Sequence, residues 1–141
     1  MAARQTVALL ELLHAGKLAS RADTAEMLTW LDNAKDPKHI GKYLVPGVTL
    51  ANKYGGSRRI AADVGIVANL PGGNGQFGAG AQPATVIIAG FTLAGAKDTA
   101  GGRLPDAAIG DLKVEAIQVM AEMARLFVST IDPTAVLPVE Q

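Results

Sequence analysis

The stretch LANKYGGSRRIAADVGIV, residues 50–67, decides the fold of this chain, because it contains two strand-length runs joined by a short turn. Small and β-branched residues fill both runs, and the segment GGSRR between them is typical of a turn. The sequence therefore predicts a β-hairpin with strands at 48–54 and 61–70. Alternation along the first strand places Lys53 on a face that is otherwise made of small side chains.

Helical periodicity lies on both sides of this hairpin. Apolar residues recur three and four positions apart, which is the spacing of one helix face. Gly16 supplies a stop for the first helix, and Ser20 followed by Asp23 is typical of the start of the second. The pattern predicts three helices, at 3–15, 21–33 and 111–130.

The run ATVIIAGFTL predicts a third strand at 84–93, so the sheet is expected to be an antiparallel three-strand meander. Helices flank this sheet from both ends of the chain, and the predicted fold class is therefore α+β, of the α/β sandwich type. Residues 1–131 are expected to form one domain. The segment 132–141 has two prolines and no periodicity, and it is expected to be an extended tail.

Composition limits the classes of function. The 141 residues are enough to bury a hydrophobic core, and 13 basic side chains balance 13 acidic ones. Because the chain has no net charge that would attract a polyanion, binding to nucleic acid is not expected. The chain has no cysteine, which excludes disulfides and thiol nucleophiles, and its most apolar run is too short to span a membrane.

Two other patterns could be taken for ligand sites, but their sequence context does not support that interpretation. Gly73, Gly75 and Gly78 match G-x-G-x-x-G, but the segment leads into a strand where a dinucleotide site needs a helix. A flexible hairpin loop is the simpler interpretation. His14 and His39 lack the spacing of metal ligands and are expected to lie on the surface or in loops, so no metal site and no cofactor are predicted.

Lys53, Gly55 and Gly56 form the candidate site of the hairpin. Two glycines at the end of a strand let a ligand approach the backbone and accept hydrogen bonds from its amides. An ammonium beside such an edge suits a substrate that carries a carboxylate next to an amide or ester. The structural alternative is that Lys53 protects an edge strand from pairing and that the glycines only make the turn.

The segment resembles the lysine-threonine/serine-glycine strand, and the strand that follows it, of the serine β-lactamase and penicillin-binding superfamily, especially its class A-like branch. The preceding segment LLELLHAGKLASRADTAEMLTWLDNAKDPKHIGKYLVPGV is similar to the two helices and the connector that lead to that strand. The segment ATVIIAGFTLAGAKD resembles the fifth strand, and the last helix resembles the C-terminal helix. The ordered succession of segments covers about residues 1 to 130.

This resemblance implies roles for the candidate residues. Lys53 would bind the substrate carboxylate and support proton transfer around the nucleophile. Tyr54 stands where the family has a hydroxyl that contacts that carboxylate, and Gly55 would let the substrate lie against the strand. The backbone amide of Gly56 would donate to the oxyanion.

Two departures from the family pattern affect the substrate. Tyr54 is bulkier than the usual residue, and Ala61 stands near a position where many members have a substrate-binding arginine. Arg58 or Arg59 could substitute for that arginine, and Ser57 is counted among the same substrate contacts. These departures count against β-lactam specificity, and an esterase or another hydrolase of the same fold is a credible alternative.

The family nucleophile lies in S-x-x-K, and none of the serines of this chain, Ser20, Ser57 and Ser129, has a lysine three residues later. The chain thus corresponds to the C-terminal half of such an enzyme. Two partners are expected, either the N-terminal half of the same hydrolase or a second copy of this chain. Ser57 in a dyad with Lys53 is the alternative nucleophile.

Two functions remain open from the sequence. The first is part of a serine acyl hydrolase that acts on a small β-lactam or ester, in the periplasm or secreted if the parent protein follows the family. No signal peptide is visible in the chain. The second is a non-catalytic α/β module that binds a partner, or dimerises, through an exposed apolar face.

Overall fold

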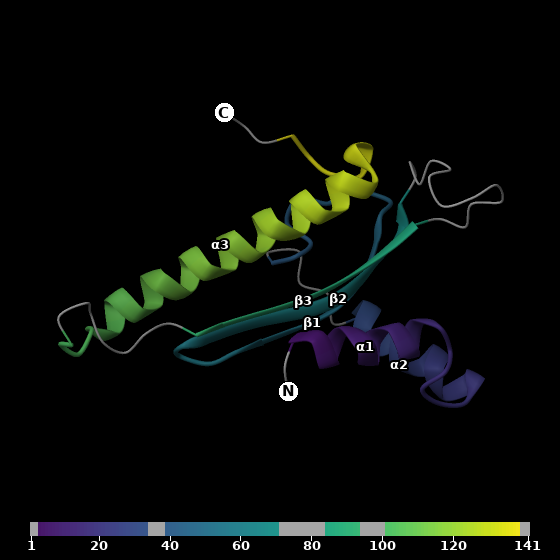
Figure 1. The fold of residues 1–141 in the computed structure, drawn as a ribbon, viewed down its shortest axis with the longest axis horizontal. Coiled ribbons are helices and arrows are strands. Elements are labelled where there is room, and N and C mark those ends of the chain that lie inside the picture. The colour runs from purple at the N-terminus through teal and green to yellow at the C-terminus, as the bar shows by residue number, and fades with distance from the viewer. Residues whose placement is uncertain (1–2, 34–38, 71–83, 94–100, 139–141) are drawn as a thin grey trace.

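A three-stranded antiparallel sheet forms the middle of the protein, with strand order β1-β2-β3 (Figure 1). The computed structural model describes residues 3–33, 39–70, 84–93 and 101–138. The predicted α+β class and the predicted meander are both confirmed. The strands are β1 at Thr49–Gly56, β2 at Ile60–Leu70 and β3 at Ala84–Leu93.

Helices cover both faces of this sheet (Figure 1). On one face α1, Ala3–His14, contacts β2 and β3, while α2, Arg21–Asn33, contacts β1. The long helix α3, Asp106–Ile131, crosses the opposite face. The sheet is therefore the middle layer of three, and each face of β1 points toward a different set of helices.

Local chemistry sets the ends of the first two helices. Gly16 adopts a φ of 67°, a left-handed conformation that glycine enters at little cost, and its amide donates to the carbonyl of Leu13 over 3.0 Å. At the start of α2 the hydroxyl of Ser20 accepts a hydrogen bond from the amide of Asp23 at 3.2 Å. The Ser20 cap thus forms as the sequence predicts.

Apolar side chains fill both interfaces between the layers. The cluster under α3 joins all three strands to the helix and to the C-terminal segment. A smaller cluster under α1 and α2 is centred on Leu10, Leu13 and Ile66. The larger cluster consists of Ile40, Leu50, Val67, Leu70, Ile88, Ala124, Val128 and Ala135.

Two elements are longer than the sequence pattern predicts. Helix α3 begins at Asp106, directly after Pro105, where the pattern placed its start near Asp111. The helix runs through the exposed Gly110, a weak helix former, because burial of the neighbouring Ile109 (3% exposed) offsets its cost. Strand β1 continues through Gly55 and Gly56, which pair with Ala62 and Ala61.

The segment after α3 packs against the loop that precedes β1, and it does not extend away from the domain. Pro133–Ala135 forms a short 3-10 helix, and the carbonyl of Ala135 accepts from the amide of Val45 at 3.0 Å. The amide of Leu137 donates to the carbonyl of Tyr43 at 2.7 Å. This segment therefore holds residues 43–45 in place.

Some expectations fall outside the described residues. The glycine motif at 73–78 lies within 71–83, which the structure does not describe.

Of the helices that the structure does describe, none combines the length and the apolar character needed to cross a membrane.

Candidate active site

Lys53 lies on β1, the outer strand of the described sheet, and its side chain is exposed. Its Nζ atom donates to the carbonyl oxygen of Tyr54 at 2.6 Å. The side chain thus curls back onto the backbone of its own strand. Lys53 is available at the sheet edge as the sequence suggested, and its catalytic role remains a prediction.

The backbone direction at Gly56 follows from the hairpin turn. The amide of Ser57 donates to the carbonyl of Ile60 at 3.0 Å, so Ser57 points its amide toward β2. In an antiparallel pair, backbone groups point alternately toward the partner strand and away from it. The N–H groups of Gly56 and Tyr54 therefore turn to the outer edge of β1, beside Lys53.

Tyr54 lies on the α3 face of β1 and packs against two groups. Its ring stacks on His39, with centroids 3.9 Å apart and an interplanar angle of 15°. A Cβ placed on Gly56 would lie only 2.5 Å from the Tyr54 hydroxyl oxygen. Gly56 thus leaves room for the Tyr54 side chain, a structural reason for that glycine which the sequence alone did not reveal.

The remaining predicted contacts spread around the turn. A Cβ on Gly55 would meet nothing within 4 Å, so the strand is open there. The carbonyl of Ser57 accepts from Lys113 Nζ of α3 at 2.9 Å, and Arg58 forms an ion pair with Asp106. Arg59 is half-buried. The substrate roles of Gly55, Ser57, Arg58 and Arg59 remain predictions.

A hollow of about 320 Å³ lies on the face of the sheet that Lys53 shares, toward α1 and α2. It reaches Ala51, two residues before Lys53 on the same face of β1. Other side chains that line it include His14, Leu28, Asp32, Thr49 and Ile66. Across the described ranges, no three metal-ligating side chains lie close enough to hold a metal ion.

A buried polar cluster next to Lys53 is the feature that the sequence analysis missed. Asn52 and Asp63 are fully buried, and the Asn52 amide donates to both carboxylate oxygens of Asp63, at 2.9 and 3.1 Å. The amide of Ile40 donates to the same carboxylate at 3.2 Å. His39 lies in the loop before β1, as one of the two expected positions had it, but it is buried, 5% exposed under the Tyr54 ring.

Burial also affects the protonation of Asp63, the carboxylate of this cluster. Loss of solvation raises the pKa of Asp63, against the opposing effects of the Asn52 and Ile40 hydrogen bonds and of the nearby His39. The sequence signal was a single acidic residue in the middle of the apolar strand IAADVGIV. Such a residue needs a buried partner, although the sequence does not say which one.

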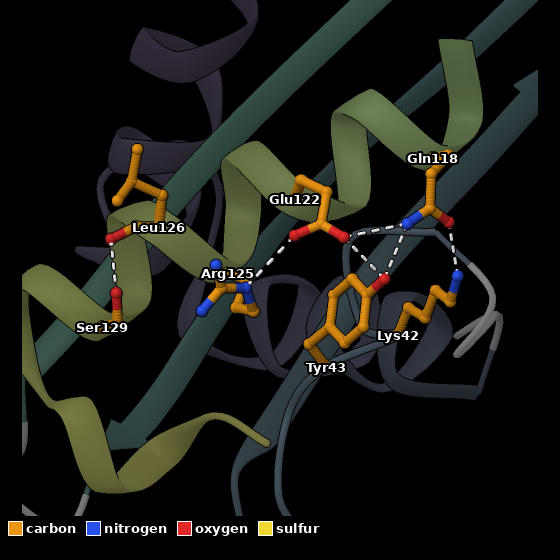
Figure 2. Close-up of polar contacts among 7 residues, drawn as sticks. All are labelled: Lys42, Tyr43, Gln118, Glu122, Arg125, Leu126 and Ser129. Atoms are coloured by element: carbon orange, nitrogen blue, oxygen red, sulfur yellow. Dashed lines mark hydrogen bonds and ion pairs between the residues drawn. The ribbon is translucent and has the colours of Figure 1, made fainter. Parts of the chain in front are cut away.

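A second polar cluster joins the loop before β1 to α3 (Figure 2). The Tyr43 hydroxyl donates to Glu122 at 2.7 Å and accepts from Gln118 at 2.7 Å, while Lys42 donates to Gln118. Arg125 pairs with the other oxygen of Glu122 at 3.2 Å. The Tyr43 hydrogen bond, helped by those from Arg125 and Gln118, holds the pKa of Glu122 below its usual value.

Replacing Tyr43 with phenylalanine is expected to raise the pKa of Glu122 toward its usual value, because the hydroxyl that stabilises the carboxylate is lost. Carbon-13 NMR of the glutamate carboxyl groups measures this change. Glu11, an exposed glutamate of α1, is the internal control, and its carboxyl signal should be the same in the variant and the wild type. An unchanged Glu122 midpoint would show that the Tyr43 contact is absent in solution.

Comparison with known proteins agrees with this fold. The β-lactamase of Sphaerobacter thermophilus DSM 20745 matches 91% of this chain at 24% identity and a TM-score of 0.57, and 40% of its own length is covered. The β-lactamase of Chitinophaga pinensis DSM 2588 matches 89% at 22% identity, with 40% of its length covered and a TM-score of 0.60. An acyl-enzyme complex of a mutant of the penicillin-binding protein PBP-A with penicillin G matches 88% at 18% identity, with 39% covered and a TM-score of 0.59.

The fold is thus that of the serine β-lactamases and penicillin-binding proteins, and the chain spans about two-fifths of the length of these structures. A model of the β-lactamase enzyme family matches residues 1–75, which include β1 with Lys53 and the whole of β2. The chain belongs to the β-lactamase enzyme family. No curated protein matches it.

Proposed function

We propose that this chain supplies part of the active site of a serine acyl hydrolase, which cleaves a β-lactam, ester or amide through an acyl-enzyme. The observation that carries the proposal is that Lys53 and the N–H of Gly56 lie at the same outer edge of β1. A cation and a backbone donor at one edge match a substrate that has a carboxylate near its reacting carbonyl.

Each group then has a role in acyl transfer. Lys53 exchanges its contact with the Tyr54 carbonyl for the substrate carboxylate and supports proton transfer at the nucleophile. The Gly56 amide donates to the oxyanion that forms when the carbonyl is attacked. Gly55 leaves the strand open, and Arg58 or Arg59 adds positive charge for the carboxylate.

The nucleophile comes from a segment outside this sequence, since no serine here stands in S-x-x-K. The similar β-lactamase structures are longer than this chain, since the match covers only 40% of their length. Ser57, four residues after Lys53 in the turn, is the alternative nucleophile within the chain.

A second candidate function rests on an exposed stripe of α3. Five apolar side chains recur at helical spacing on a face that is not turned to the sheet, and each is between 39% and 58% exposed. Such a stripe suits a protein partner, either the missing part of the hydrolase or a second copy of this chain. The stripe consists of Leu112, Val119, Met123, Leu126 and Phe127.

Intact-mass spectrometry tests the two functions. The chain, purified with any polypeptide that remains bound to it, is exposed to a fluorophosphonate and separately to benzylpenicillin. We expect an adduct on a second polypeptide, and Lys53→Met should slow its formation about 100-fold because a proton-transfer group is removed. Lys17→Met, which changes an exposed lysine after α1, is the control and should leave the rate unchanged.

Two other outcomes of this experiment would assign the function differently. An adduct on this chain that disappears in Ser57→Ala would assign the nucleophile to Ser57. If no adduct forms and sedimentation shows a stable dimer that Met123→Glu dissociates, the chain is an interaction module and the hydrolase proposal fails.

A further inference from the structure

Asp63 connects three segments of the protein beneath the candidate site. It lies in the middle of β2, directly across the ladder from Tyr54, and is fully buried. Its carboxylate accepts from the side chain of Asn52 on β1 and from the backbone of Ile40 in the loop that precedes β1. One buried acceptor thus holds the site strand and this loop together.

Close packing makes this connection specific. A Cβ on Gly65 would lie 2.7 Å from the Cβ of Asn52 and 2.7 Å from the Cδ1 of Ile40. Gly65 therefore lets both donors approach the sheet closely enough to reach Asp63. Ile40, which is 2% exposed, belongs to the core under α3.

The loop is also held at its other end. Tyr43 is hydrogen-bonded to Glu122 and Gln118 of α3 (Figure 2), and the Val45 amide donates to Ala135. The loop cannot shift along β1 without breaking contacts at both ends. Asp63 is thus connected, through this loop, to the long helix α3.

The site residues are the direct neighbours of this connection. Lys53 follows Asn52 in β1, and Tyr54 pairs with Asp63 across the ladder and stacks on the ring of His39. We propose that Asp63 is the positioning residue of the site, which fixes the backbone from Lys53 to Gly56 through Asn52 and Ile40. This inference rests on the proposed acyl hydrolase function and adds a residue that does not itself touch the substrate.

The charge of Asp63 gives the connection a measurable signature. A carboxylate accepts all three hydrogen bonds, whereas a protonated carboxyl group has an O–H donor that competes with the amides of Asn52 and Ile40. Burial shifts this protonation to a higher pH than usual. The titratable groups nearby include His39, Tyr54 and Lys113 of α3, whose Nζ lies close to Gly56. Across the ladder from Asp63, β3 presents Gly90, which lies against Met120 of α3.

Two-dimensional ¹H–¹⁵N NMR of the full chain, followed over pH, tests the inference without acyl chemistry. We expect the Gly55 and Gly56 amide signals to shift with the same midpoint as the Asp63 carboxyl carbon. In Asp63→Asn this component should disappear. Gly110, exposed on α3, is the internal control and should not follow Asp63.

In material that forms an adduct, Asp63→Asn should also slow acylation about tenfold, because a displaced strand misplaces the donors of the site. The inference is overturned if Gly55 and Gly56 follow only His39, or do not shift, in the wild type. That titration alone decides the matter if the variant does not fold. If Gly56 follows Asp63 but no adduct ever forms, Asp63 does position the strand and the hydrolase function is what fails.

Discussion

Asp63→Ala is expected to lower the free energy of unfolding by about 3 kcal/mol. The change removes the acceptor of the Asn52 side-chain amide and of the Ile40 N–H, and the loss of a buried hydrogen-bond acceptor costs roughly 1–3 kcal/mol. The removal of a desolvated carboxylate offsets part of that cost. Urea denaturation, followed by far-UV circular dichroism, measures the difference.

The matched control is Asp111→Ala, which removes an exposed aspartate from α3. Surface changes of this kind usually alter the unfolding free energy by less than about 0.5 kcal/mol. If Asp63→Ala is no more destabilising than Asp111→Ala, then the buried network does not form in solution.

The pH dependence of this first effect has a definite sign. The pKa of Asp63 is raised in the folded protein, so folding favours its protonated form. The stability that this protonation contributes is fully present below the unfolded pKa of about 3.9 and is lost as the pH rises through the folded pKa. The stability difference between the wild type and Asp63→Ala should therefore be larger at acidic pH and become smaller across that window.

Gly65→Ala is expected to lower the free energy of unfolding by about 2 kcal/mol. The added methyl group would lie 2.7 Å from Asn52 and from Ile40, and also 3.0 Å from the Ala51 carbonyl oxygen, so the hairpin and the loop must separate. Overpacking of a buried site costs roughly 1–3 kcal/mol. The same urea titration measures it, and the Gly55 and Gly56 amide signals should move with it.

Gly110→Ala makes the same chemical change in open space on α3 and is the control. Alanine is a better helix former than glycine by about 1 kcal/mol, so this variant should be more stable than the wild type. If both glycine variants gain stability, the close approach at Gly65 is wrong.

Much of the fold could be predicted from periodicity alone. The hairpin, the third strand and the first two helices depend on local spacing, on Gly16 and on the Ser20 cap, all of which are visible in the sequence. The apolar spacing placed the start of α3 near Asp111, whereas burial of Ile109 extends the helix back to Asp106. That burial depends on tertiary contacts, which spacing does not reveal.

The candidate site was predictable only in part. Strand alternation correctly separated Lys53 from Tyr54, since the two faces of a strand follow from sequence parity. The partners of Asp63 could not be predicted, because Asn52 and Ile40 lie 11 and 23 residues away and meet it only in the folded sheet. The Tyr54 ring lies on the α3 face of β1 and stacks on His39 there. This contact could not be predicted either, because it also forms only in the folded protein.

The hydrogen bonds between Tyr43 and α3 also bear on the order of assembly during synthesis. Tyr43 and Glu122 are 79 residues apart in the chain, and Lys42 and Gln118 are 76 apart. Contacts between such distant residues close large loops, and they form late in folding. A nascent chain on the ribosome can pair β1 with β2 early, but the Tyr43 end of the loop cannot be fixed until α3 has emerged.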